Sequence, residues 1–185
     1  QLLKESHLAL ANDIEQRIGA AASGLAEAAA APHRNDTVTL EVIATPSEGS
    51  DATEPSAPRR AEILHGLGNV IENAVQFCTN RVEVVVTWDD QLITMEVMDD
   101  GPGVAPSVLM RLGEPYVSSR RKSGRMGLGV FIAKTLLERT GASMSFFNGR
   151  QYGARIVITW PRQVLEALSA DQRDVKLHGW GWGQR

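Results

Sequence analysis

The sequence has little cysteine, few aromatic residues and no long apolar run. A single cysteine, Cys78, excludes an intrachain disulfide and indicates a reducing compartment. No apolar stretch approaches the roughly 20 residues of a membrane-spanning helix, and no signal peptide is visible. The net charge of −3 gives no reason to expect a nucleic-acid partner. These absences predict a cytoplasmic protein.

The rest of the composition is that of a globular domain, with 43% hydrophobic and 22% charged residues. The 185 residues suffice for one domain and an appendage. Because the chain begins at Gln1 rather than Met, we expect it to be a piece of a longer protein, whose other part could hold an inner-membrane anchor.

Hydrophobic periodicity predicts both helices and strands, and therefore an α/β fold. Residues 2–30 are predicted as one long helix that ends at Pro32. The pattern further predicts a strand over residues 37–44, a polar loop over 45–58, a helix over 59–77, strands over 81–88 and 91–98 joined by a tight Asp89-Asp90 turn, a short helix over 105–112, a helix over 130–139, strands over 143–147 and 154–160, and a flexible C-terminal tail over 164–185.

The helix over residues 59–77 carries two asparagines, Asn69 and Asn73, on its polar face. Asparagine is a weak helix former because its amide competes for backbone hydrogen bonds. Two of them four residues apart therefore indicate a polar ligand on that face. Asn73 offers a neutral amide oxygen, which suits Mg²⁺ when phosphates and waters supply the other ligands.

Two glycine-rich segments follow in an order that indicates a nucleotide. In Asp99-Asp-Gly-Pro-Gly103, Asp99 can accept a hydrogen bond from an exocyclic amine such as that of adenine. Gly127-Leu-Gly129 opens a helix, and free N–H groups at a helix N-terminus suit phosphate. Positive charge precedes this helix, from Arg120, Arg121, Lys122 and Arg125.

These segments resemble the motifs of the ATP-binding catalytic domain of sensor histidine kinases, in the wider group of gyrase B, the Hsp90 chaperones and MutL. Residues 69–74 look like the N box, 99–103 like the G1 box, 115–116 like the F box and 127–134 like the G2 box. The run over residues 113–142 is especially similar to the RegB/PrrB-type redox-responsive kinases. The resemblance covers residues 32–163, and residues 1–31 resemble only the end of a dimerisation stalk.

The resemblance implies a two-layer α/β sandwich of the Bergerat (GHKL) type, with a mixed sheet backed by helices on one face, that binds ATP and Mg²⁺. It implies Asn69 and Asn73 as the catalytic pair, Asn73 as the Mg²⁺ ligand, and residues 113–126 as a mobile lid. The implied ATP-binding residues are Asn69, Asn73, Asp99, Gly101, Gly103, Tyr116, Arg120, Arg121, Lys122, Gly127, Leu128 and Gly129. The implied partners are the phosphoacceptor helical domain of the same kinase, a response regulator and a second copy of the full-length protein.

One position distinguishes the branches of this group. Hydrolytic members resemble each other in having glutamate, as general base, where this chain has Asn69. Asn69 cannot take a proton, so we expect phosphoryl transfer to a protein histidine rather than hydrolysis. Three alternatives stay open: a degenerate scaffold without turnover, an ATPase of the gyrase/MutL type, and a serine-directed anti-sigma kinase.

The four histidines do not match the sequence expected around a phosphoacceptor. His7, His33, His65 and His178 are therefore interpreted as ordinary polar residues, and this chain by itself is not expected to autophosphorylate. Arg125 stands where related kinases have glycine, which leaves the ATP affinity open. Cys78 is interpreted as a small hydrophobe rather than a redox sensor.

Overall fold

The computed structural model describes residues 20–115, 128–149 and 153–177, and within them the side chains from residue 21 as far as residue 169. A mixed five-stranded sheet has the order β2-β4-β5-β7-β6. Its strands are β2 (Thr39–Pro46), β4 (Arg81–Trp88), β5 (Leu92–Asp99), β6 (Ser143–Asn148) and β7 (Ala154–Pro161). β2 and β4 are parallel and the other neighbours are antiparallel. The predicted α/β sandwich with a mixed sheet is confirmed.

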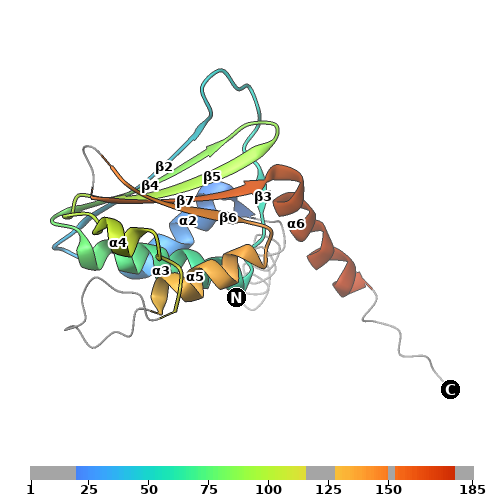
Figure 1. The fold of residues 1–185 in the computed structure, drawn as a ribbon. Helices are drawn as coiled ribbons and strands as arrows, with labels where there is room; N and C mark the ends of the chain where they lie inside the picture. The colour runs from blue at the N-terminus through green and yellow to red at the C-terminus, as the bar shows by residue number, and fades with distance from the viewer. Residues whose placement is uncertain (1–19, 116–127, 150–152, 178–185) are drawn as a thin grey trace, which may run out of the picture.

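Helices cover one face of this sheet and leave the other open (Figure 1). They are α2 (Ala22–Ala30), α3 (Ala61–Phe77) and α5 (Gly129–Glu138), with the short helices η1 (Ala31–His33) and α4 (Pro106–Leu109) beside them. Within the described ranges, no helix is long and apolar enough to cross a membrane.

The core lies between the sheet and the helix layer because apolar residues alternate along the strands. On β4 and β5, every second residue is buried, from Val82 to Trp88 and from Ile93 to Asp99. Trp160 of β7 is fully buried, and its indole N–H donates to Thr140 Oγ1 at 2.9 Å. Burial of one such apolar side chain contributes about 1.5–3 kcal/mol.

The predicted helix over residues 2–30 is wrong at Ala20 and Ala21. These residues form β1 (Ala20–Ala21), which pairs antiparallel with β3 (Ser56–Ala57), and α2 begins only at Ala22. β3 itself lies inside the predicted loop over residues 45–58. The pairing fixes the start of α2. Leu25 and Ala26 of this helix are buried in the same core as the apolar residues of the sheet.

The predicted tail over residues 164–185 is wrong in its first part. Residues Arg162–Leu177 form helix α6, which leaves β7 directly. Leu165 of this helix is fully buried in the main core, although Val164 beside it is exposed. The core therefore includes residues on both sides of the range 32–163, and that division into domains stays a prediction.

The other predicted elements match within a few residues. The turn after β4 is one residue longer than predicted, since β5 begins at Leu92. Asp89 Oδ1 closes this turn by accepting from the backbone N of Gln91 at 2.7 Å and of Leu92 at 2.8 Å. α4 lies within the short helix predicted over residues 105–112, and Gly141, with φ of +88°, follows α5 as its C-terminal stop.

Gly66 of α3 packs directly against Leu137 of α5, and this contact predicts the result of two alanine substitutions. A Cβ at Gly66 would lie 2.6 Å from Leu137 Cγ, in the fully buried part of the core. Overpacking of this kind costs about 1–3 kcal/mol, against a helix-propensity gain of about 1 kcal/mol. We expect Gly66→Ala to lower the free energy of unfolding in urea by up to about 2 kcal/mol.

Gly68→Ala is the matched control in the same helix. A Cβ there would meet only His33 Nε2, at 3.6 Å, which is an ordinary contact. This variant should be as stable as the wild type or more stable, by up to about 1 kcal/mol. Equal stability of the two variants would contradict the packing described here.

Candidate nucleotide-binding site

Asp99 ends β5 with a buried carboxylate, 4% exposed. Its Oδ1 accepts hydrogen bonds from the backbone N of Gly101 at 2.8 Å and of Ala154 at 3.4 Å. Its main-chain oxygen accepts from Gly153 N at 2.6 Å. Asp99 therefore joins the loop after β5 to the start of β7.

Burial raises the pKa of the Asp99 carboxyl above its ordinary value. The N–H groups of Gly101 and Ala154 oppose this increase, and the nearby charge of Asp100 adds to it. A carboxylate that has lost much of its hydration gains free energy from a ligand that donates a hydrogen bond to it. The Asp99 carboxylate is therefore suited to bind a polar N–H group.

The loop after β5 and the start of β7 pack tightly around Asp99 because Gly101 and Gly153 have no side chain. A Cβ at Gly101 would lie 2.1 Å from the main-chain oxygen of Phe77. A Cβ at Gly153 would lie 2.4 Å from Asp99 Oδ1 and 2.5 Å from the oxygen of Gly101. Neither position has room for a side chain, so both glycines are required by packing.

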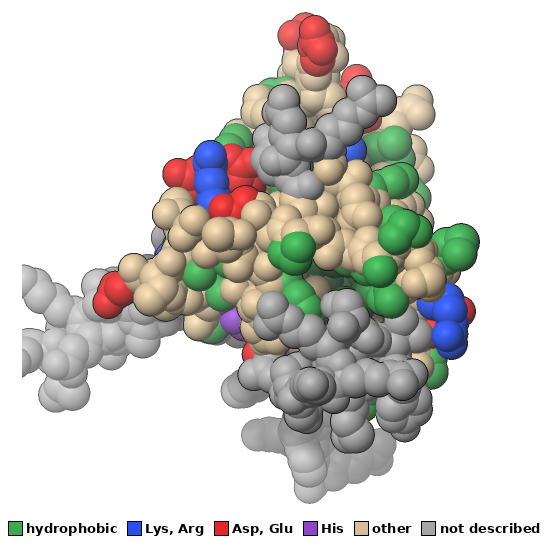
Figure 2. All heavy atoms as spheres, turned by 60° about the vertical axis from the view of Figure 1, so that its left-hand side comes forward, with side chains coloured by type: hydrophobic (Ala, Val, Ile, Leu, Met, Phe, Trp, Pro, Cys, Tyr) green, Lys and Arg blue, Asp and Glu red, His purple; other side chains and the backbone are tan. Residues whose placement is uncertain are grey.

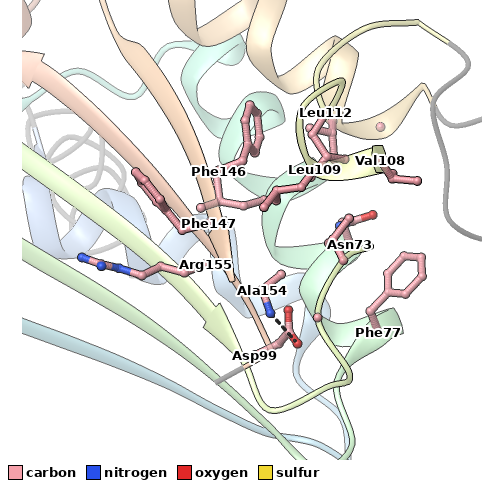
Figure 3. Close-up of a pocket in the computed structure, with 15 residues that line it drawn as sticks. Asn73, Phe77, Asp99, Val108, Leu109, Leu112, Phe146, Phe147, Ala154 and Arg155 are labelled. Atoms are coloured by element: carbon pink, nitrogen blue, oxygen red, sulfur yellow. Dashed lines mark hydrogen bonds between the residues drawn. The ribbon is translucent and has the colours of Figure 1, made fainter. Parts of the chain in front are cut away.

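Asp99 lines a hollow of about 700 Å³, part of which is open to solvent. We name it the Asp99 hollow; it lies between α3, α4, the N-terminus of α5 and the strands β6 and β7 (Figure 3). Its wall is mostly apolar, with Phe77, Val104, Val108, Leu109, Leu112 and Phe146 among the lining residues. Hydrophobic side chains also gather on the side of the molecule where α4 lies (Figure 2). An apolar lining with a single buried carboxylate among the described residues is typical of a small-molecule site.

The N-terminus of α5 lies at the edge of the Asp99 hollow. Gly129, its first residue, and Val130 both line the hollow, and a Cβ at Gly129 would meet no atom within 4 Å. No acidic residue stands in the first turn of α5. The free N–H groups and the helix dipole therefore favour an anion there.

The two asparagines of α3 lie at different hollows. Asn73 lines the Asp99 hollow and is drawn beside Val108 and Phe77 in Figure 3. Asn69, one turn earlier, lines a separate groove between α2 and α3, together with His65 and Glu72. We name it the α2–α3 groove. Asn69 and Asn73 thus line two separate hollows, and the single ligand-binding face predicted for them stays a prediction.

Four predicted site residues meet at the Asp99 hollow: Asn73, Asp99, Gly103 and Gly129. Gly101 supports Asp99 from outside the lining, and Leu128 is the N-cap residue of α5. Tyr116, Arg120, Arg121, Lys122, Arg125 and Gly127 lie outside the described residues. Sequence reasoning did not identify the apolar lining of β6 and α4, because an apolar strand or helix residue gives no signal that separates a ligand contact from core.

Asp100, which has no predicted role, links the turn after α3 to the loop after β5. Its Oδ1 accepts from the backbone N of Thr79, Asn80 and Arg81 at 2.8–3.0 Å. Burial raises the pKa of Asp100, but the N–H groups of Asn80, Arg81 and Thr79 outweigh it and lower the pKa overall. The turn after α3 is thereby joined to the loop after β5.

Cys78 fits its interpretation as a small hydrophobe. It is half-buried against the core, and its Sγ donates to the main-chain oxygen of Val75 at 3.2 Å. Burial, with the charges of Asp100 and Asp99, raises the pKa of the thiol. Because the thiolate is the reactive form, Cys78 is a poor nucleophile at neutral pH.

Comparison with known proteins decides the family. The model of "Histidine kinase-, DNA gyrase B-, and HSP90-like ATPase" matches residues 59–164, more than half of the chain. The chain belongs to this ATPase family. The match includes α3, the loop after β5, α5 and β7, which are the elements that build the Asp99 hollow.

Within this ATPase family, the chain is similar to sensor histidine kinases. It is 38% identical over 170 residues to the sensor histidine kinase RegB of Cereibacter sphaeroides, a match that covers 81% of this chain and 37% of RegB. The sensor protein RstB of Escherichia coli is 32% identical over 99 residues, covering 51% of this chain and 23% of RstB. The predicted resemblance to RegB/PrrB-type kinases is confirmed, although the chain spans well under half the length of these curated relatives.

Solved structures confirm the fold of the ATPase domain. The mycobacterial sensor histidine kinase MprB aligns with a TM-score of 0.64 at 19% identity, covering 77% of this chain and 96% of that chain. Full-length ShkA, solved in complex with AMPPNP, aligns with a TM-score of 0.60 at 24% identity, covering 86% of this chain and 37% of that one.

The raised pKa of Asp99 predicts a pH-dependent gain in stability for Asp99→Asn. Above the pKa of the folded state, the wild type carries a buried charge that an asparagine lacks, whereas the hydrogen bonds from Gly101 and Ala154 can remain. We expect thermal melts at pH 7 to place the melting temperature of Asp99→Asn at or above that of the wild type. The difference should shrink as the pH falls, because the carboxyl of the folded wild type takes up a proton at a higher pH than an ordinary aspartate does. A loss of stability that does not change with pH would contradict this account of Asp99.

Proposed function

We propose that this chain binds Mg²⁺-ATP in the Asp99 hollow and supplies the γ-phosphoryl group to a histidine of a sensor kinase. The observation that carries the proposal is the buried carboxylate of Asp99 in the wall of an apolar hollow. Membership of the ATPase family and the identity to RegB support it.

The chemistry of adenine fits the Asp99 end of the hollow. The exocyclic amine of adenine is a donor, and the Asp99 carboxylate accepts hydrogen bonds but does not donate them when ionised. The ring has two apolar faces, which suit lining residues such as Val104, Leu109 and Phe146. A base without that amine leaves the buried carboxylate without its donor, so it should bind more weakly.

The chemistry of a triphosphate fits the other end, where α5 begins. The N–H groups at Gly129 and Val130 suit phosphate oxygens. The proposed lid over residues 113–126 would complete this end with Arg120, Arg121 and Lys122, and its junction with α5 would add Gly127. Tyr116 would stand at the start of this lid.

Mg²⁺ fits the site only together with phosphate. No group of three histidine, cysteine or acidic residues in the described ranges could hold a metal by itself. Asn73, an oxygen ligand facing the same hollow, is suited to the octahedral Mg²⁺ shell that phosphates and waters complete. Mg²⁺ would neutralise the charge that develops on the phosphate oxygens.

The site favours phosphoryl transfer over hydrolysis. Asp99 is the only carboxylate among the described residues that line its hollow. We propose that it binds adenine and does not activate a water. Asn69, in the position of the hydrolytic glutamate, cannot act as a general base, and Glu72 lines the α2–α3 groove. Transfer to an imidazole nitrogen needs positioning and charge stabilisation, because the acceptor is itself a nucleophile.

We further propose three partners for the full-length protein. The phosphoacceptor histidine belongs to a helical domain of the same kinase, a second copy forms a homodimer, and a response regulator takes the phosphoryl group from the histidine. Residues 1–31 would be the end of the dimerisation stalk, and their last part, α2, also contributes Leu25 and Ala26 to the core.

Calorimetric titration with ATP tests the base end of the site. The wild type should bind ATP and its non-hydrolysable analogue in the presence of Mg²⁺. Asp99→Asn should weaken binding by about 10- to 100-fold, the effect of losing one hydrogen bond to a charged group. Asp90→Asn removes a carboxylate from the exposed turn after β4 and should bind as the wild type does. No binding by the wild type at millimolar ATP would contradict the proposed function.

Asn73→Ala tests the metal end. This variant should lose affinity for ATP in Mg²⁺ and match the wild type in EDTA, because Asn73 would contact the nucleotide only through the metal. The same titrations check it, with Asn80→Ala, an exposed asparagine outside the lining, as the control. An equal loss with and without Mg²⁺ would assign Asn73 to the nucleotide itself.

A further inference from the structure

Asn148, the last residue of β6, reaches across to the loop after β5. Its side-chain oxygen accepts from Val104 N at 2.9 Å, and its side-chain NH₂ donates to the main-chain oxygen of Val104 at 2.7 Å. One amide side chain thus pairs with both backbone groups of a single residue, as neighbouring residues of an antiparallel sheet do.

The orientation of this amide is fixed by the hydrogen-bonding chemistry. Val104 N–H can only donate and its carbonyl can only accept, so the oxygen of Asn148 must face the first and the nitrogen the second. Aspartate has the same size but no donor. It would place a second oxygen against the Val104 carbonyl and lose the second bond.

The same two strands hold both ends of the loop. Gly153 N donates to the main-chain oxygen of Asp99 at 2.6 Å, and Gly149 N donates to Gly153 O at 3.1 Å. The β6–β7 side therefore holds Asp99 through Gly153 and holds Val104 through Asn148. Both ends of the loop are thus hydrogen-bonded to the end of β6 and the start of β7.

The loop residues that Asn148 holds face the Asp99 hollow. Gly103 and Val104 both line it, together with Asp99. Gly103 has φ of +75°, and a Cβ there would lie 2.9 Å from Asn148 Oδ1. We name the two hydrogen bonds between Asn148 and Val104 the clamp. The clamp requires glycine in this left-handed turn, since a side chain at residue 103 would displace the amide.

We propose that Asn148 is a positioning residue for the purine end of the nucleotide site. It holds Gly103 and Val104 at the wall of the hollow, at a fixed distance from Asp99, without itself contacting the triphosphate. The inference rests on the proposed function. It predicts that loss of the clamp weakens the binding of the nucleoside part and leaves the Mg²⁺-dependent part unchanged.

Titration of Asn148→Ala with ATP and with ADP tests the proposal. Both nucleotides should bind about tenfold more weakly, as the loss of two neutral hydrogen bonds implies, and by the same factor with or without Mg²⁺. Asn148→Asp should show a similar loss. Asn35→Ala is the matched control, because the Asn35 side chain accepts from Thr37 N and Val38 N in a turn that does not line the hollow.

Hydrogen exchange of the Val104 amide in nucleotide-free protein gives a second readout. The exchange of this amide should be faster in Asn148→Ala than in the wild type and in Asn35→Ala. The three proteins are compared at the same interval below their own melting temperatures, so that global unfolding does not explain the difference. Wild-type affinity for ATP in Asn148→Ala, or unchanged exchange at Val104, would overturn the inference while the proposed function stands. If the wild type binds no ATP at millimolar concentration, the proposed function fails and the inference falls with it, whatever the exchange at Val104.

Discussion

The site depends on one buried carboxylate at the end of β5. Asp99 can stay ionised there only if backbone N–H groups replace part of its lost hydration, and Gly101 and Ala154 supply them from two separate segments. This requirement brings the loop after β5 against the start of β7 and excludes side chains at Gly101 and Gly153. Backbone groups therefore hold the Asp99 carboxylate in the wall of the hollow, where we propose that the purine binds.

The proposed phosphate end depends on the position of α3 and α5 on the same sheet face. Gly66 lets the two helices approach, so that Asn73 of α3 and the first residues of α5 line one hollow. Asn69 lies beyond the edge of that hollow, in the α2–α3 groove. Of the two predicted asparagines, only Asn73 therefore faces the Asp99 hollow.

The elements with strict periodicity could be predicted from the sequence, and those defined by long-range pairing could not. Strands β4, β5 and β7 follow from alternating apolar residues, and α3 from its apolar face. Ala20 and Ala21 have high helix propensity, yet they pair with a strand more than thirty residues away, which no local pattern reveals. α6 was missed although Leu165 and Leu168 are spaced as on one face of a helix, and the contact of Leu165 with the core depends on the tertiary fold. The hydrogen bonds of Asn148 and Asp100 likewise depend on the tertiary fold.

The most direct test is a crystal structure of this chain with Mg²⁺ and a non-hydrolysable ATP analogue. We expect the exocyclic amine of adenine within hydrogen-bond distance of the Asp99 carboxylate, about 2.7–3.2 Å. The amide oxygen of Asn73 should coordinate the metal, and the phosphates should face the N-terminus of α5. A base that lies away from Asp99, or a nucleotide bound in the α2–α3 groove, would contradict the account.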